Sequence, residues 1–440
     1  MTKIIRIILA TVLAALMVLL AACGNTEPNK DDHTTTPSDN VGTSDIADTS
    51  DTSTPDTTPV EPEDPLKEQK AQVKQKVLAI MAEDDKESPT SLFEFFCGDY
   101  SIGFVADNND FGASVNRIWQ KDGVTAIEYK DGRTEYTLVR NGYQFKLVSR
   151  EGNTEVTSVA AVTNPDKYVP SIFADFSIDI SAIYSGAEDQ TDVDDPPLSE
   201  DMLTVSEDLK TCTFSDEYMA SVTDMLLTEM DYSEEDKVAF LAEYSGSGVY
   251  TAEDNSVVFI IKGKEKTLGD MTITVSYVQD DKNGYSMSTK MEYTITAEGI
   301  SIPTSNELII RDVKYDGNTP VSATVESRVL EQNATIVSEG LTYTVNTSNI
   351  SLFYLDTQTP TLNVNIMQQS DTAVAGQTVS QSAQIDLMLK QRSLSYMAAQ
   401  NSVVYSEVSG ENVTLAAPED AVIPQIVYDL ADKAYYDIVQ

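Results

Sequence analysis

Hydrophobic and polar residues alternate along most of the chain beyond residue 100, which is the pattern of β-strands with one buried face. Ile385, Leu387 and Leu389 illustrate it, because every second side chain of a strand lies on the same face. The segments that show this pattern are 100–106, 113–120, 125–129, 134–140, 143–149, 203–213, 256–262, 271–279, 285–297, 307–315, 321–330, 341–346, 351–355, 361–368, 380–392, 403–408 and 412–416. The pattern predicts a protein built mainly of β-structure.

Turn dipeptides separate several of these segments. Asp122-Gly123, Asp131-Gly132, Asn141-Gly142 and Asn283-Gly284 each lie between two predicted strands. Asn-Gly and Asp-Gly favour two-residue hairpin turns, because both central residues adopt positive φ. The first three follow one another closely, so the sequence predicts an antiparallel meander in this region.

Four segments change from a period of two to the spacing of an α-helix. In the first, residues 66–83, the apolar positions Val73, Val77 and Ile80 fall on one stripe, and prolines punctuate both ends. The other three are 216–230, a short helix capped by Ser233 and ending near 244, and 425–436. The expected fold class is therefore α+β, predominantly antiparallel β with a few helices.

The predicted strands and helices are distributed unevenly along the chain. Residues 66–302 mix helices and strands, whereas residues 303–440 are nearly all strand with one helix at the end. Pro303 lies at this change of pattern. We therefore expect a helix-plus-antiparallel-sheet domain over 66–302 and a second, mostly β domain over 303–440.

Residues 1–22 have the organisation of a secretory signal peptide, with basic Lys3 and Arg6, an apolar run over 7–20 and small residues at the end. The tetrad Leu20-Ala21-Ala22-Cys23 resembles the lipobox of bacterial lipoproteins. The resemblance implies that the Cys23 thiol receives a diacylglyceryl group and that the mature chain starts there. Acyl chains such as palmitate would then hold it at the outer face of the cell membrane. A plain transmembrane anchor is the alternative, but the apolar run is short for a span.

Residues 24–65 consist mainly of Thr, Ser, Asp and Pro and contain no aromatic residue. Such a composition buries no core, so we expect a disordered linker between the lipidated Cys23 and the folded part. The chain's one histidine, His33, lies in this linker and is expected to be solvated. The predicted role of the segment is to hold the folded part away from the bilayer.

Charge and composition exclude several classes of function. The chain has 29 basic and 71 acidic side chains, a net charge of −42, which disfavours nucleic acid and anionic lipid head groups as partners. With one histidine, it can form neither a histidine-ligated zinc site nor a histidine-based catalytic triad. We expect no cofactor, and the chain is not expected to be an enzyme.

Two further groups of residues are candidates for chemistry. Cys97 and Cys212 form a disulfide or remain two separate thiols, and their spacing does not distinguish these alternatives. Asp192, Asp194 and Asp195, in an acidic loop, offer hard oxygen ligands for calcium. They lack the spacing of an EF-hand, so solvated surface carboxylates are the simpler interpretation.

The closing segment carries an architectural resemblance. Residues 409–415 (Ser-Gly-Glu-Asn-Val-Thr-Leu) and then 418–421 (Pro-Glu-Asp-Ala) give a Gly turn, a last strand and a proline-led exit. Together with a helix followed by long antiparallel strands, this resembles the LolA-like and LppX-like half-barrel lipoproteins. The resemblance implies a curved sheet whose concave face is apolar and receives a hydrophobic guest. The chain is about twice as long as one half-barrel, so it holds either two or one extended by another β domain.

These observations favour a non-enzymatic lipoprotein that binds an apolar or amphipathic ligand, or a protein partner, on a β-rich scaffold. The alternative is a structural or adhesion-like protein that displays a sheet surface. A hydrolase with a carboxylate pair is the weakest interpretation, because so many acidic residues make any pairing uninformative. A continuous apolar concavity would favour ligand binding, and a filled core would favour display.

Overall fold

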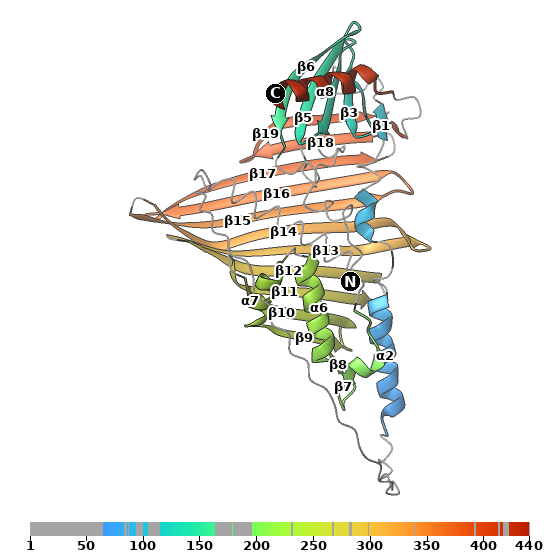
Figure 1. The fold of residues 1–440 in the computed structure, drawn as a ribbon, viewed down its shortest axis with the longest axis vertical. Coiled ribbons are helices and arrows are strands. Elements are labelled where there is room, and N and C mark those ends of the chain that lie inside the picture. The colour runs from blue at the N-terminus through green and yellow to red at the C-terminus, as the bar shows by residue number, and fades with distance from the viewer. Residues whose placement is uncertain are drawn as a thin grey trace, which may run out of the picture.

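The computed structural model describes residues 65–82, 86, 88–93, 100–103, 115–162, 178, 196–229, 232–265, 268–280, 284–297, 299–338, 340–390, 393–411, 414–416 and 422–439. Within these ranges the chain forms two antiparallel sheets, neither of which closes on itself, and four α-helices (Figure 1). The expectation of an α+β, predominantly antiparallel β protein is confirmed.

The larger sheet, called here the long sheet, has 13 strands that neighbour one another in chain order. Its strands are β7 (Leu203–Val205), β8 (Thr211–Phe214), β9 (Ser245–Thr251), β10 (Ser256–Glu265), β11 (Gly269–Asp280), β12 (Gly284–Ala297), β13 (Ile300–Asp316), β14 (Thr319–Ser338), β15 (Leu341–Asp356), β16 (Thr361–Val374), β17 (Gln377–Lys390), β18 (Ser393–Gln400) and β19 (Val403–Glu411). Because each strand pairs with the next along the chain, short turns join most of them (Figure 1).

The smaller sheet, called here the short sheet, has seven strands in the order β20-β1-β2-β3-β4-β5-β6. They are β1 (Tyr100–Gly103), β2 (Val115–Lys121), β3 (Val124–Tyr129), β4 (Thr134–Arg140), β5 (Tyr143–Arg150), β6 (Asn153–Ala161) and β20 (Thr414–Ala416). The predicted meander is confirmed, and two of its three turns have the expected backbone, whereas in Asp131-Gly132 only Gly132 adopts a positive φ, of 82°. Asp122 and Gly123 adopt φ values of 50° and 72°, and Asn141 and Gly142 adopt 53° and 79°.

Two predicted elements differ from the structure. The segment 203–213 is a hairpin, β7 and β8, rather than one strand, because Leu209 adopts a φ of 59° in the turn between them. The segments 341–346 and 351–355 are parts of one continuous strand, β15. Its middle residues are polar on both faces, so periodicity alone breaks off where the strand does not.

The helices agree with the prediction. They are α2 (Lys67–Ala82), α6 (Asp216–Glu229), α7 (Glu234–Leu241) and α8 (Gln425–Val439). The cap of α7 is also as expected, since the Ser233 hydroxyl accepts a hydrogen bond of 3.2 Å from the Asp236 amide.

Two segments far apart in the sequence contribute to the short sheet. The late strand β20 pairs with β1, placing Leu415 opposite Ile102. Helix α8 covers one face of the sheet, where its Val427 and Ala431 pack with Trp119 in a buried cluster. The short sheet is thus assembled from residues 100–161 and 414–439, and the long sheet lies between them in sequence (Figure 1).

The expected boundary at 302/303 falls inside β13, which pairs without interruption with β12 on one side and, with register shifts, with β14 on the other. The two described sheets therefore divide elsewhere. Pro303 is accommodated because the register between β13 and β14 is irregular from Ser301 to Thr304. Proline has no N–H to donate to a ladder, and a bulge is where a sheet tolerates it.

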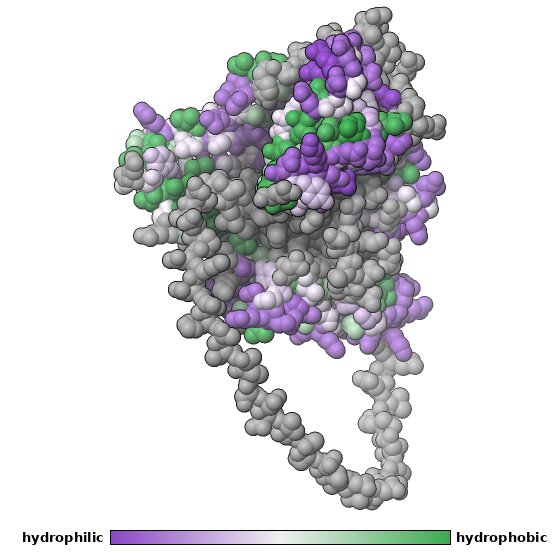
Figure 2. Space-filling view, turned by 45° about the horizontal axis from the view of Figure 1, so that its top comes forward, coloured by the Kyte–Doolittle hydropathy of each residue, from purple (hydrophilic) through white to green (hydrophobic). Residues whose placement is uncertain are grey.

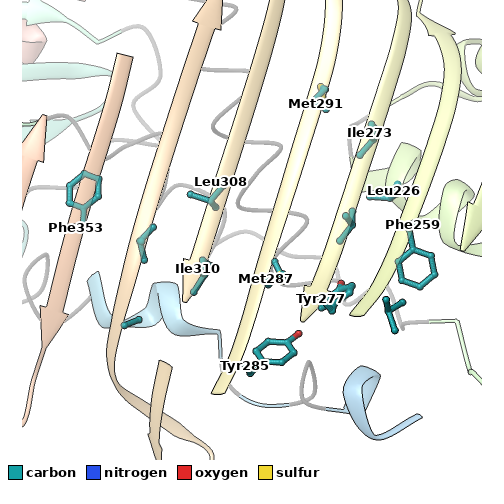
Figure 3. Packing of buried hydrophobic residues seen from close by; sticks show 14 of the residues in the cluster. Leu226, Phe259, Ile273, Tyr277, Tyr285, Met287, Met291, Leu308, Ile310 and Phe353 are labelled. Carbon is teal, nitrogen blue, oxygen red and sulfur yellow. The ribbon is translucent and has the colours of Figure 1, made fainter. Parts of the chain in front are cut away.

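The main hydrophobic core lies on one face of the long sheet, called here the inner face. Helices α6 and α7 pack on β9 and β10, and α2 packs beside β7, β8 and β11. Figure 3 shows Leu226 of α6 beside Phe259, Tyr277 and neighbouring side chains that all rise from this face. Farther along the sheet, the centroids of the Phe93 and Phe353 rings lie 5.3 Å apart.

The short sheet has a built-in reporter, because Trp119 is the only tryptophan of the chain and is 6% exposed. We predict that Val427→Asp lowers the free energy of unfolding of the short sheet by at least ~3 kcal/mol, since a buried valine is lost and a carboxylate is desolvated. Trp119 emission during urea unfolding measures it. Ile426→Asp, at a neighbouring position that is 45% exposed, is the matched control and should change the midpoint little. Equal shifts in both variants would contradict the packing of α8.

Candidate functional site

Strands β14–β17 continue well past the hydrophobic core. Residues 331–350 and 367–384, called here the wing, pair in uninterrupted register from β15 to β17. Among the wing residues whose exposure is described, Ala334 alone is buried. The wing is thus a single layer of sheet, and its hairpin ends project to the left in Figure 1.

Local hydrogen bonds explain how the wing keeps its shape. The register between β14 and β15 is irregular from Glu331 to Ala334, and Asn333 adopts a φ of 56° there. The Asn346 side chain accepts the Asn333 amide hydrogen at 2.8 Å, so this irregular backbone remains paired. Thr347 donates to the Glu331 carboxylate at 2.8 Å across the same strands. Cross-strand polar pairs of this kind each stabilise a sheet by roughly 0.2–1 kcal/mol.

Near the wing, polar side chains are buried among the apolar ones of the inner face, in a group called here the polar band. Asn306 and Thr289 are 2% and 1% exposed, and the Asn306 amide donates to the Tyr293 hydroxyl at 3.2 Å. The Asn306 Oδ1 and Thr289 Oγ1 atoms are buried without a hydrogen-bond partner. Burial raises the pKa of Tyr293, the nearby Glu331 carboxylate adds to this, and the hydrogen bond from Asn306 opposes it.

The opposite, outer face of the long sheet carries a shallow concavity of about 540 Å³ over β11–β14. Its lining residues are Asp270, Lys290, Glu292, Tyr293, Thr294, Pro303, Thr304, Ser305, Glu307, Arg328, Leu330 and Gln332. The Arg328 guanidinium donates to Glu326 at 2.7 Å and to Glu307 at 3.2 Å, and Lys290 pairs with Glu292 at 2.7 Å. The hydrogen bond to Glu326 is the main cause that raises the pKa of Arg328, so the cation is retained.

Two further concavities lie on the wing itself. One of about 260 Å³ includes Asn349 and Gln368, whose register places them on the inner face. The other, of about 410 Å³, includes Ile350, Met367 and Gln384. These three are cross-strand neighbours on the outer face, where an apolar floor is bordered by amides. Amide and hydroxyl side chains dominate both linings, which suits hydrogen bonding to a partner rather than acid–base chemistry.

The residues singled out from the sequence are only partly described. Cys23, Cys97, Asp192, Asp194 and Asp195 lie outside the described residues. Cys212 is fully buried on β8 and has no disulfide partner among the described residues, and burial raises the pKa of its thiol. Since the position of Cys97 is not described, the Cys97–Cys212 disulfide stays a prediction. In the part of the chain that the structure describes, no three His, Cys, Asp or Glu side chains are grouped to hold a metal ion.

Among the helices that the structure describes, none is long and apolar enough to cross a membrane. No known family model, curated protein or solved structure matches the chain. The lipobox and half-barrel resemblances therefore stay expectations.

The sequence predicts the wing only in part. The segments 341–346 and 380–392 were predicted as strands, but the predicted strands 321–330 and 361–368 end at its border, because Ser, Thr, Asn and Gln occupy both faces beyond them. One signal was available. Gly340 and Gly376 mark two turns, and the polar segments flanking them have similar lengths and many Thr residues, which favour strands.

Tyr293 of the polar band leads to a prediction about how the stability of the protein depends on pH. The folded pKa of Tyr293 lies above the ordinary tyrosine value of 10.0, so its stabilising effect is complete below pH 10 and is lost as the pH rises through the folded pKa. Tyr293→Phe should therefore reduce the loss of stability between about pH 9 and pH 11. Urea midpoints across this range measure the difference. Tyr354→Phe, on the exposed side of β15, is the control, and an unchanged pH dependence in Tyr293→Phe would contradict the assignment.

Proposed function

We propose that the chain is a lipid-anchored extracytoplasmic protein, without catalytic activity, that binds a protein partner on the outer face of its long sheet. The observation that carries the proposal is the wing, in which four strands extend past the core and every residue of described exposure except Ala334 is exposed or half-buried. Such an extension adds exposed sheet surface without adding a hydrophobic core. That surface can contact another molecule.

The anchor is supported by the sequence. The tetrad ending at Cys23 follows a basic and apolar leader, and a polar linker separates it from the first folded helix. Stable attachment of a lipoprotein needs more than one acyl chain, which lipidation at such a cysteine supplies. A chain with a net charge of −42 would be kept off anionic head groups, so the linker and anchor together hold it near the surface.

The packing of the inner face favours a protein partner over an enclosed apolar guest. The apolar side chains of β9–β12 are buried against α2, α6 and α7, and Phe353 of β15 is buried against Phe93. The outer face is open and holds concavities with mixed polar and apolar linings. Shallow, mixed surfaces of this kind are typical of protein contacts, whereas lipid sites are deeper and mostly apolar.

The outer face offers apolar contact points that suit such a partner. Met367, Met388 and Tyr354 are 46%, 43% and 36% exposed, and they lie on neighbouring strands of this face. Methionine side chains are flexible and polarisable, so they adapt to different partner surfaces. A purely structural display protein would use the same sheet without a specific contact at these positions.

Lipidation is tested by growing cells that express the full chain with an alkyne analogue of palmitate. We expect the label on the wild-type chain and on Cys97→Ser, the matched control, and none on Cys23→Ala, because only Cys23 follows the lipobox. Label retained on Cys23→Ala, or absent from the wild type, would refute the anchor.

Partner binding is tested with a photo-crosslinking amino acid placed at Met367 of the full chain in intact cells. We expect one discrete adduct from this position, because it lies on the outer face beside the concavity. Val238, which is 69% exposed on α7, is the control position and should give no such adduct. No adduct at Met367, or the same products from both positions, would leave display as the better description.

A further inference from the structure

One edge of the wing has no neighbouring strand among the described residues. Strand β17 starts at Gln377, but its pairing with β18 starts only where Ala383 lies opposite Gln400. On its other side β17 pairs with β16 along its whole length. Residues 377–382 are therefore an edge strand, and all six are exposed.

The direction of the free backbone groups follows from Ser382. Its amide donates to the Asn401 side chain at 2.7 Å, and its carbonyl accepts from the Asn401 amide at 2.7 Å. The backbone groups of Ser382 therefore face away from β16. Since these groups alternate sides along a strand, Thr378 and Ser380 also present their N–H and C=O outward.

This edge lacks the features by which proteins block pairing between edges. Natural edges carry Lys, Pro, inward charges or bulges for this purpose. Residues 377–384 read Gln-Thr-Val-Ser-Gln-Ser-Ala-Gln, without a charge or a proline. The pairing of β17 with β16 has no register shift, so no bulge turns the edge aside.

We propose that this edge pairs with the same edge of a second copy, antiparallel, about a two-fold axis at Val379. Thr378 of one copy then lies opposite Ser380 of the other, and their outward backbone groups form reciprocal hydrogen bonds. The same surface patch serves both copies, as two-fold symmetry requires. The absence of charge matters, because two chains with net charges of −42 approach most easily where neither presents a charge.

The contact between the two edges is small, so we expect pairing mainly between copies that are anchored in the same membrane. Six strand residues extend about 20 Å, so the interface is well below the roughly 1,200 Å² of stable complexes. Pairing is therefore weak in solution. Anchoring of both copies in one membrane raises their effective concentration, so the inference rests on the proposed lipid anchor.

The register gives a sharp test by disulfide scanning. With Thr378 and Ser380 bonded across the axis, Val379 faces its own copy in a non-hydrogen-bonded pair, with Cα atoms about 4.5 Å apart. That separation fits a disulfide. Two Gln377 residues, or two Gln381 residues, would lie about 13 Å apart along the strands, which does not fit. Val379 is 61% exposed, so a cysteine there should leave the fold intact.

The experiment uses the full chain in membranes of the expressing cells, oxidised with copper-phenanthroline and run on non-reducing gels. We expect Val379→Cys to give at least about fivefold more covalent homodimer than Gln377→Cys or Gln381→Cys, with the wild-type chain as baseline. Equal dimer from all three positions would indicate random collision. No dimer, or an adduct of Val379→Cys with another protein, would also overturn the proposal.

A backbone variant checks the hydrogen bonds. Ser380→Pro removes an N–H that faces outward, where the ladder to β16 does not use it. Added to Val379→Cys, it should reduce the dimer about fivefold, whereas Ser380→Ala should not. An undiminished dimer with Ser380→Pro would overturn the pairing, and the cysteine scan decides the matter if that variant misfolds. Alkyne-palmitate labelling of the same membranes reports on the anchor separately.

Discussion

Pairing of backbone groups between neighbouring antiparallel strands is the interaction on which this structure depends. In the wing no hydrophobic core supports it, so its register is inherited from the buried halves of the same strands. Phe353, Val364 and Leu387 are neighbours across β15–β17 and are buried together on the inner face. A slip of one residue in any one of these strands would turn its buried side chain of this group to solvent. The core thus fixes the position of polar residues that lie far from it.

The same dependence links the two sheets. The short sheet is completed by β20 and α8, which follow the whole long sheet in the chain. Strand β1 pairs with both β2 and β20, so late residues complete an early sheet. Such distant pairing costs chain entropy before it gives contacts, which favours slow folding of the completed short sheet. Figure 2, which looks more directly onto this end, shows a band of hydrophobic residues beside polar ones at the surface.

Comparison of the predicted turns, caps and strands with the structure shows which of them the sequence alone predicts. Turn chemistry at Asn141-Gly142 and the cap at Ser233 predicted local structure correctly, because both depend on neighbouring residues. Strand β18 was missed although Leu394 and Ala398 are buried on one of its faces, and β15 was split into two because its middle residues are polar on both faces. A strand whose two faces are both exposed has no reason to alternate, so periodicity fails there.

The candidate site could be predicted from the sequence less well than the fold. Whether residues 377–382 form an edge depends on where β18 ends, and the burial of Asn306 depends on what packs against β13. Neither is a property of a local pattern.

By itself, the sequence determined the class of the fold, the helices, the hairpin turns, the acidic character of the surface and the expectation of a lipid anchor at Cys23. These follow from composition and from interactions within a few residues. Only the tertiary structure decided that residues 100–161 and 414–439 share one sheet, that Pro303 lies within β13, and that residues 377–382 of the wing have no neighbouring strand on one side among the described residues. The physical reason is that strand pairing joins residues distant in sequence, and the hydrogen bonds that do so are made by backbone groups common to every residue except proline.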